Sequence, residues 1–289
     1  MFSFCGAPEL LDGVIWLSCY ITTGKHVAFY LSFLVIILLL LIAAPAAILF
    51  GFGGAIASRS NIAPLRWLGR LYITMVRGIP DIAFFLFVPI ALDQAFEFLR
   101  HKAFCDSTDP VWQGDDFIVC SSAKMPLNSA SAWVHDAYGF ALALLSFAIV
   151  FGAFAANTLS GAMSAVPKAQ LETAASFGMN EQQIFRRVLL PQMWVFALPG
   201  LSNLWMILVK ATPLLFLLGV EDVVYWAREL GGSKTSAHSY PHGDWRLWYF
   251  LILLGFYLTL TWLSEKLFTK LMRRFSFGQA TVGGSEVPL

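Results

Sequence analysis

The sequence predicts an all-α integral membrane protein, from its composition and from the length of its apolar runs. The 289 residues are 58% hydrophobic and only 13% charged, with a mean hydropathy of +0.68. Soluble domains carry about 25% charged residues. The sequence contains several uncharged stretches of about 20 residues, the length that a helix needs to cross a hydrocarbon core. The net charge of +1 gives no indication of a nucleic-acid partner, and the apolar composition makes the lipid bilayer the expected environment.

Five stretches are expected to span the membrane, at about residues 26–58, 71–99, 137–163, 192–220 and 247–268. At about 1.5 Å per residue the first is longer than the core is thick, so it should tilt, bend near Pro45 or project beyond the interface. The second stretch has a weak hydropathy signal, because Arg77, Gly78, Pro80 and Asp81 interrupt it. Residues 10–21 are apolar but too short to cross. We expect an interfacial helix there, with a buried or re-entrant piece as the alternative.

The distribution of basic residues predicts an N-terminus outside the cytoplasm and a cytoplasmic C-terminus. With this orientation ten Lys and Arg residues lie near the inner span ends and seven are spread over longer outer loops. The N-terminal segment 1–25 and the loop 100–136 are then extracytoplasmic, and the loop 164–191 and the tail 275–289 are cytoplasmic. The permease domain is expected over residues 26–274. The first 24 residues lack the ordered features of a cleavable signal peptide, so insertion should rely on the spans.

All four cysteines, Cys5, Cys19, Cys105 and Cys120, fall in segments assigned to the outside. An oxidising compartment permits disulfides, and a bond between Cys105 and Cys120 would close a short loop. Four cysteines allow three pairings, and the sequence does not choose among them. Two free thiols in a mobile loop are the alternative. Neither His135 nor His242 belongs to a group of residues spaced like the ligands of a metal ion, so no metal site is expected.

The loop between the third and fourth spans has a well-specified local structure. Pro167 suits the start of a helix, and Gly178 suits the left-handed residue that ends one. Asn180 with Gln183 three residues later forms a capping box for a second short helix, expected to stop at Pro191. Leu171, Ala174 and Ala175 are expected to offer a small apolar contact face. By itself this pattern is also compatible with an ordinary amphipathic hairpin stabilised by its own packing.

The same loop carries a motif. Residues 172–191 read ETAASFGMNEQQIFRRVLLP, which is Glu-Thr-Ala, then Gly178, Val188 and Leu190-Pro191. This resembles the EAA loop of permease subunits of bacterial ABC importers. Further matches to the polar amino acid uptake branch occur at 77–80 (RGIP, where that branch has RGTP), 152–154, 166–167, 186–192, 197–199 and 208–210. The resemblance covers about residues 58–274, with the outer loop after Arg100 as an insertion.

The resemblance implies a type I ABC importer permease with a five-span core in a bacterial inner membrane. Such a subunit would carry polar amino acids or opine-like derivatives by alternating access. The implied partners are an ABC ATPase dimer beneath the loop, an extracytoplasmic binding protein and a second permease subunit. ATP and Mg²⁺ would be bound by the ATPase, and no cofactor by this chain. The implied ATPase-coupling residues are Glu172, Thr173, Ala174, Gly178, Arg186, Arg187, Leu190 and Pro191, with Thr173 replacing an alanine and Val188 an isoleucine.

Ionisable residues inside spans are candidates for a translocation path. Arg77 and Asp81 would share a face on a continuous helix, and Asp81 could meet a substrate ammonium. Alternatively Arg77 extends to the interface and Asp81 neutralises it. Lys210 could bind a substrate carboxylate, or form a salt bridge to Glu221, to Asp222 or to a partner subunit.

One departure from the family pattern concerns residues 157–161. The family commonly has a glutamate followed three residues later by arginine or another residue and then glycine, whereas here Asn157, Ser160 and Gly161 stand at these positions. Loss of the acid argues against a cationic substrate in this half-site and for a pore shared with a paralogous permease. A hydrogen bond of Asn157 between helices is the simpler explanation.

Two other function classes have less support in the sequence. A membrane enzyme would need an intramembrane catalytic set, and the sequence has neither a nucleophile elbow nor a metal-spaced His/Asp cluster. A passive channel or non-ABC secondary carrier would need no ATPase-docking loop. The chain also lacks a Gly-x-x-x-x-Gly-Lys nucleotide-binding loop, so any ATP hydrolysis is expected in a separate subunit.

Overall fold

The computed structural model describes Cys5, Leu11, residues 13–105 and residues 111–275, with the side chains of all of these except residues 76–78, 81 and 113. Helices dominate the described chain. They are α1 (Gly13–Ile21), α2 (Gly24–Ser58), α3 (Ala63–Gly78), α4 (Asp81–Phe104), α5 (Ala132–Ala165), α6 (Lys168–Ser176), α7 (Glu181–Ile184), the π-helix η3 (Phe185–Leu189), α8 (Leu190–Ala211), the 3₁₀-helix η4 (Thr212–Leu218), α9 (Val223–Gly231) and α10 (Arg246–Phe275). A two-stranded antiparallel hairpin, β1 (Trp112–Gln113) and β2 (Asp116–Phe117), lies in the loop after α4.

Five helical segments of the described chain are long and apolar enough to cross a membrane: Gly24–Ser58, Ile82–Phe104, Ala132–Ala165, Glu181–Leu218 and Arg246–Phe275. The expected all-α architecture with five spans is therefore confirmed. The first is a single helix of 35 residues that contains Pro45. At about 1.5 Å per residue it is longer than a hydrocarbon core is thick, as the sequence indicated. The short apolar segment before the first span forms a helix, α1, and its place at the membrane interface stays a prediction.

The second expected span, 71–99, is not one helix. The chain breaks at Ile79 and Pro80, where the backbone is extended (φ −121°, ψ 135° and φ −58°, ψ 135°), and this break separates α3 from α4. Proline disfavours helical geometry in the residue before it, and Gly78 has no side chain to restrict the change of direction. α3 instead turns back along α2, and the spanning helix runs from Ile82 to Phe104.

The most extensive contact between helices of the described chain is that of α2 with α5, and the two backbones approach closely. A β-carbon on Gly51 would lie 2.7 Å from Ala155 Cβ, and one on Gly152 would lie 2.6 Å from Phe50 Cβ and 2.5 Å from the Tyr72 hydroxyl. In a membrane, where apolar side chains gain little by leaving lipid, small residues let helix backbones approach and gain van der Waals contact. α5 is accordingly the central helix, with 56% of its most apolar window buried against 17% for α10.

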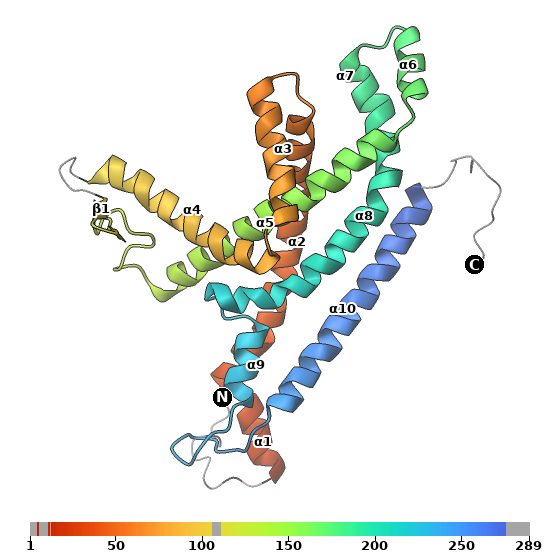
Figure 1. The fold of residues 1–289 in the computed structure, drawn as a ribbon. Coiled ribbons are helices and arrows are strands. Elements are labelled where there is room, and N and C mark those ends of the chain that lie inside the picture. The colour runs from red at the N-terminus through yellow and green to blue at the C-terminus, as the bar shows by residue number, and fades with distance from the viewer. Residues whose placement is uncertain (1–4, 6–10, 12, 106–110, 276–289) are drawn as a thin grey trace.

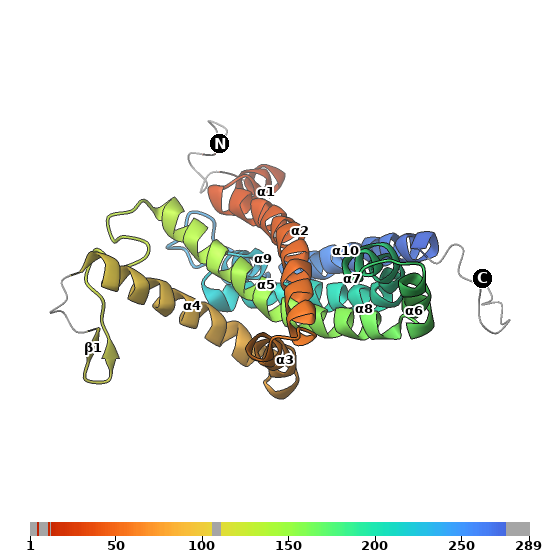
Figure 2. The same ribbon diagram turned by 90° about the horizontal axis from the view of Figure 1, so that it is seen from above.

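The helices are arranged with two distinct ends. Figure 1 shows the α2–α3 turn, the α6–α7 hairpin and the C-terminal end of α10 toward one end, and α1 and α9 toward the other. In Figure 2, α4 reaches away from α8 and α10, with the β-hairpin beyond its far end. We call the end with the α6–α7 hairpin the hairpin end and the opposite one the α1 end. The ten basic residues assigned to the cytoplasm lie on elements of the hairpin end.

The α1 end is held by covalent and polar contacts. A disulfide joins Cys5 to Cys19 there, and a second one, Cys105 to Cys120, lies apart from it at the far end of α4. Tyr20 in α1 lies 2.8 Å from His242 Nε2 and donates to the Leu230 carbonyl (3.2 Å). Glu229 in α9 accepts from both Lys25 (2.7 Å) and Lys234 (3.0 Å).

Asp222 caps the start of α9 from a fully buried position. The Val224 and Tyr225 backbone N–H groups donate to its Oδ1 at 3.1 and 2.9 Å, whereas Oδ2 has no hydrogen-bond partner among the described residues. Burial raises the pKa of this carboxyl from 3.8 to about 6, because the charged form loses its hydration.

The α2–α5 contact predicts opposite effects for two glycines of α2. Gly51→Ala should lower the thermal midpoint in a fixed detergent, because overpacking costs about 1–3 kcal/mol. Gly53→Ala should leave the midpoint unchanged or raise it, since a β-carbon there meets no atom within 4 Å and alanine is the better helix former. Equal midpoints for the two variants would contradict the proximity of α2 and α5.

The buried cap predicts a pH-dependent stability. Between pH 3.8 and about 6 the folded state holds the Asp222 proton more tightly than the unfolded state, so the unfolding free energy should fall as pH rises through this window. Asp222→Asn retains an acceptor for the α9 N–H groups but does not titrate. We expect this variant to lose that fall and to be more stable than wild type at pH 8, measured by thermal unfolding across the pH range.

Asp244→Asn is the control for this measurement. Hydrogen bonding to Arg246 lowers the pKa of Asp244, so its ionised form is favoured in the folded state and the sign of its effect is reversed. A gain of stability at pH 8 in both variants, or in neither, would overturn the assignment to Asp222.

Candidate functional site

The α6–α7 hairpin joins α5 to α8 and projects at the hairpin end of the molecule (Figure 1). Pro167 precedes α6 as expected, and its carbonyl accepts the Gln170 N–H at 3.1 Å. α6 ends in a Schellman motif, in which the Gly178 N–H donates to the Ala175 carbonyl (2.9 Å) and the Met179 N–H to the Ala174 carbonyl (3.2 Å). This motif requires a left-handed residue, and Gly178 has φ +81°. The predicted glycine turn is confirmed.

The capping box that starts α7 is also present. The Gln183 N–H donates to Asn180 Oδ1 (2.9 Å), and the Asn180 N–H donates to Gln183 Oε1 (3.0 Å). Each side chain satisfies a backbone N–H that has no partner within the helix. The two ends of the turn are therefore fixed by interactions local to residues 174–183.

The prediction that the second loop helix stops at Pro191 is wrong. α7 continues through η3 into α8, so residues 181–211 form one uninterrupted helical rod. A proline would clash with the carbonyl four residues earlier in a regular α-helix. The wider turn of η3, in which the Leu190 N–H donates to the Phe185 carbonyl, relieves this constraint. Movement of the hairpin is thereby connected directly to α8.

The expected apolar contact face of α6 also differs. Ala174 is buried and Leu171 half-buried against the chain itself, and only Ala175 is exposed. Leu171, Phe185 and Leu189 pack against a cluster of α5 and α8 side chains that includes Leu159 and Met193. The face of the hairpin available to a partner is thus not the alanine face.

The exposed face carries polar and aromatic side chains. Glu172 and Thr173 are exposed on α6, and Arg186 and Arg187 are exposed on η3. Leu190 is half-buried and Pro191 exposed. Phe177, just before Gly178, is 81% exposed at the tip of the hairpin. Sequence reasoning missed Phe177, although an aromatic residue beside a glycine turn, outside the buried stripe of its helix, was a signal that could have identified it.

Two of the candidate path residues lie at the break between α3 and α4. Arg77 is in the last turn of α3 and Asp81 is the first residue of α4, so they do not share a face of one helix. Their side chains lie outside the described part of the chain, and the predicted pairing of the two is not tested.

The other path candidates lie on α5 and α8. Asn157 is exposed and Ser160 half-buried on α5. Lys210 is exposed near the end of α8, and among the described residues it forms no ion pair with Glu221 or Asp222. Asp222 instead directs its acceptor oxygen at α9. Asn157 and Ser160 lie about one turn apart on α5, and Lys210 lies on α8.

Comparison with known proteins places this geometry in a family. Residues 47–276 match the family of binding-protein-dependent transport system inner membrane components. The hairpin, the break after α3 and the four later spanning helices all lie within the matched region.

Individual relatives agree with this match. The chain is 31% identical over 235 residues to the histidine/lysine/arginine/ornithine transport system permease protein HisQ of Salmonella typhimurium, covering 80% of this chain and 86% of that protein. It is 28% identical to the arginine ABC transporter permease protein ArtQ of Escherichia coli K12, covering 70% and 75%. It is also 28% identical to the octopine transport system permease protein OccQ of Rhizobium radiobacter, covering 76% and 78%.

A solved structure supports the fold. The crystal structure of an amino acid ABC transporter with histidines superposes with a TM-score of 0.60 at 20% identity, covering 91% of this chain and all of the matched chain. From the family match over most of its length, together with the five spans and the hairpin between α5 and α8, the chain belongs to the family of inner membrane components of binding-protein-dependent transport systems.

Proposed function

We propose that this chain is the pore subunit of an ATP-driven ABC importer for polar amino acids or opine-like derivatives. The observation that carries the proposal is the α6–α7 hairpin, whose turn is fixed by its own hydrogen bonds and whose tip presents Glu172, Thr173 and Phe177 to solvent. The names of the relatives supply the substrate class. The outward-directed polar face suits docking on a separate ATPase, which binds ATP and Mg²⁺.

The fold provides a route from this docking site to the membrane. One side of the hairpin joins α5 through Val166 and Pro167, and the other continues without interruption into α8. Phe185 and Leu189 pack on the cluster that contains Leu159 of α5 and Met193 of α8. A displacement of the hairpin by closure of the ATPase dimer would therefore move both helices together, and this movement would switch the cavity between inward and outward access.

The proposed orientation puts the hairpin end in the cytoplasm. The basic residues near the α2–α3 turn, on the hairpin and near the end of α10 support this, because cytoplasmic span ends concentrate Lys and Arg. The disulfides Cys5–Cys19 at the α1 end and Cys105–Cys120 after the C-terminal end of α4 lie in segments assigned to the outside and suit an oxidising compartment. The N-terminus is then periplasmic, and a substrate-binding protein would deliver its ligand to that side.

The translocation path is proposed to include Arg77, Asp81, Asn157, Ser160 and Lys210. Because Asn157 stands where the family commonly has glutamate, this half of the pore lacks one partner for a cationic substrate. A paralogous second permease subunit is therefore favoured over a second copy. The exposed apolar surfaces of α3 and α4, including Leu68, Ile82 and Phe87, leave room for such a subunit as well as for lipid.

The first prediction concerns coupling. In nanodiscs with the ATPase, the second permease and the binding protein, one member of a panel of polar amino acids and opines should stimulate ATP turnover. Gly178→Asp should abolish assembly or stimulation, because it places a β-carbon and a charge at a left-handed residue of the hairpin. If no ATPase copurifies and the variant behaves as wild type, a passive channel or secondary carrier becomes the better description.

The second prediction concerns the tip. Phe177→Ala should weaken ATPase binding by about 2 kcal/mol, or roughly 30-fold in Kd, as expected for loss of an aromatic anchor at the centre of an interface. Phe104→Ala is a matched control, because Phe104 is 67% exposed but lies at the far end of α4. Binding measured by biolayer interferometry on nanodiscs should be unchanged in the control. Equal affinity of Phe177→Ala and wild type would remove Phe177 from the interface.

A further inference from the structure

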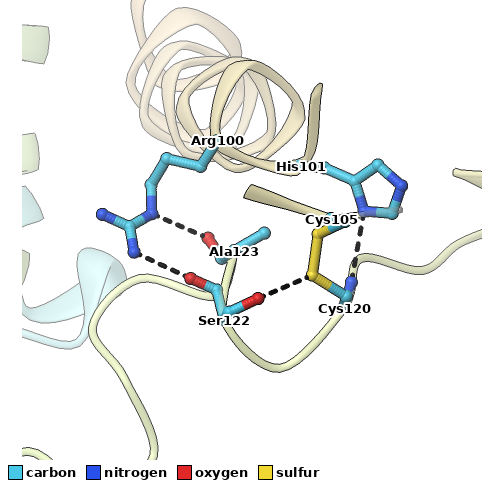
Figure 3. The surroundings of a disulfide bond; sticks show 6 residues. All are labelled: Arg100, His101, Cys105, Cys120, Ser122 and Ala123. Atoms are coloured by element: carbon cyan, nitrogen blue, oxygen red, sulfur yellow. Dashed lines mark hydrogen bonds between the residues drawn. A yellow bond between two sulfur atoms is a disulfide. The ribbon is translucent and has the colours of Figure 1, made fainter. Parts of the chain in front are cut away.

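Three metal-ligating side chains converge where α4 ends. The candidate ligand atoms of His101, Cys105 and Cys120 all lie within 4.8 Å of one another. Figure 3 shows the imidazole of His101 beside the sulfur pair, with Arg100 reaching the loop on the other side. His101 is 5% exposed and the two cysteines are half-buried. The function proposed above does not use this cluster.

The local structure explains why the three side chains meet. His101 and Cys105 are four residues apart at the C-terminal end of α4, so they share one face, and the Cys105 N–H donates to the His101 carbonyl at 3.0 Å. The returning loop is fixed to the same helix end. Arg100 donates to the Ser122 and Ala123 carbonyls at 2.8 and 3.2 Å.

The loop contacts also hold Cys120 in place. The Cys120 N–H donates to His101 Nδ1 at 3.2 Å, and the Met125 N–H donates to Glu97 Oε1 at 3.2 Å. Cys120 itself and the residues that follow it, Ser122, Ala123 and Met125, are thus tied to α4 without the disulfide. The Arg100 and Glu97 contacts would keep the two sulfurs near the imidazole after the bond between them is opened, and an ion bound at Nδ1 would replace the Cys120 N–H there.

The donor set has a defined metal preference. A tetrahedral Zn²⁺ ion with bonds of about 2.3 Å to sulfur and about 2.0–2.1 Å to nitrogen holds its ligand atoms about 3.5–3.8 Å apart. The three candidate atoms already lie within 4.8 Å of one another, so opening the disulfide and rotating the side chains would let them surround one ion. Thiolate and imidazole ligands favour Zn²⁺ over the hard cations Mg²⁺ and Ca²⁺. Three protein ligands would leave a fourth position for water or for Ser122, whose Oγ lies 3.0 Å from Cys120 Sγ.

We propose that His101, Cys105 and Cys120 form a redox-gated Zn²⁺ site, closed by the disulfide when oxidised and available to the ion when reduced. A dithiol donor supplies two electrons and two protons, the Cys105–Cys120 bond breaks to give two thiols, and the donor becomes a disulfide. Zn²⁺ then binds two thiolates and the imidazole, and both thiol protons are released. In either state the loop after α4 stays linked to the helix end.

The second disulfide provides an internal comparison. Cys5 and Cys19 are also joined, and they pack among Tyr20 and Tyr240. Within the described residues no third His, Asp, Glu or Cys ligand completes a cluster with them by the same distance. Reduction alone therefore yields two pairs of thiols in one chain, of which only one is expected to bind the ion.

The test uses the full chain in nanodiscs, reduced with a water-soluble phosphine under anaerobic conditions and then titrated with Zn²⁺. One ion per chain should bind after reduction and none before. With Zn²⁺ present, alkylation followed by mass spectrometry should show Cys105 and Cys120 protected and Cys5 and Cys19 modified. Co²⁺ substituted for Zn²⁺ should give the sulfur-to-metal charge-transfer absorption of a thiolate site.

Two variants separate this site from binding by any reduced thiol pair. His101→Ala retains both cysteines and should weaken Zn²⁺ binding by roughly 100-fold or more, since loss of an outer partner of a ligand alone costs about 10–100-fold. Cys5→Ser combined with Cys19→Ser should bind as wild type does. Disulfide content before reduction and circular dichroism after it verify that each protein is folded.

Three results would overturn the proposal. They are absence of Zn²⁺ binding to folded chain with four titratable thiols, equal binding by His101→Ala and wild type, and equal protection of the two cysteine pairs. None of them bears on the transport function, because the assays contain neither ATPase nor substrate.

Discussion

The rest of the structure depends on the close contact between α2 and α5. Gly51 and Gly152 leave no room for a β-carbon at this contact, and the two backbones approach as only small residues permit. α5 thereby becomes the buried centre, and α4, α8 and the hairpin are all placed relative to it. Burying apolar side chains gives little driving force between helices inside a bilayer. Close van der Waals packing at this contact therefore has to provide the stability that the hydrophobic effect provides in a soluble core.

The hairpin shows a second kind of order, because it is specified locally and then attached to that core. A Schellman motif at Gly178 and a capping box at Asn180 fix the turn through hydrogen bonds within ten residues. The π-helical turn before Pro191 carries the helix on into α8. A rigid local turn on a continuous helical rod is well suited to transmit a displacement. If the helix ended at Pro191 instead, a displacement of the turn would not be transmitted directly to α8.

The α1 end is built on a different principle from the hairpin end. The Lys25–Glu229 ion pair and the hydrogen bonds of Tyr20 with Leu230 and His242 join segments that are far apart in the sequence, whereas the Cys5–Cys19 disulfide and the buried cap at Asp222 act locally. Covalent and ionic links substitute there for the helix packing available within the spans. The cluster at His101 lies apart from both ends, where α4 stops, and it adds a chemistry that depends on the oxidation state of the cysteines.

The sequence by itself determined the all-α class, the number of spans, the glycine turn and the capping box, because hydropathy and turn chemistry act over short separations. Only the tertiary structure decided that Ile79 and Pro80 divide the second span, that Pro191 continues a helix, and that Ala174 faces inward while Phe177 stands exposed. Proline disfavours helical geometry before it at Pro80 and at Pro191 alike, so the local rule does not distinguish the broken helix from the continuous one. Residues far apart in the sequence provide the packing against these segments, so local sequence patterns cannot predict it.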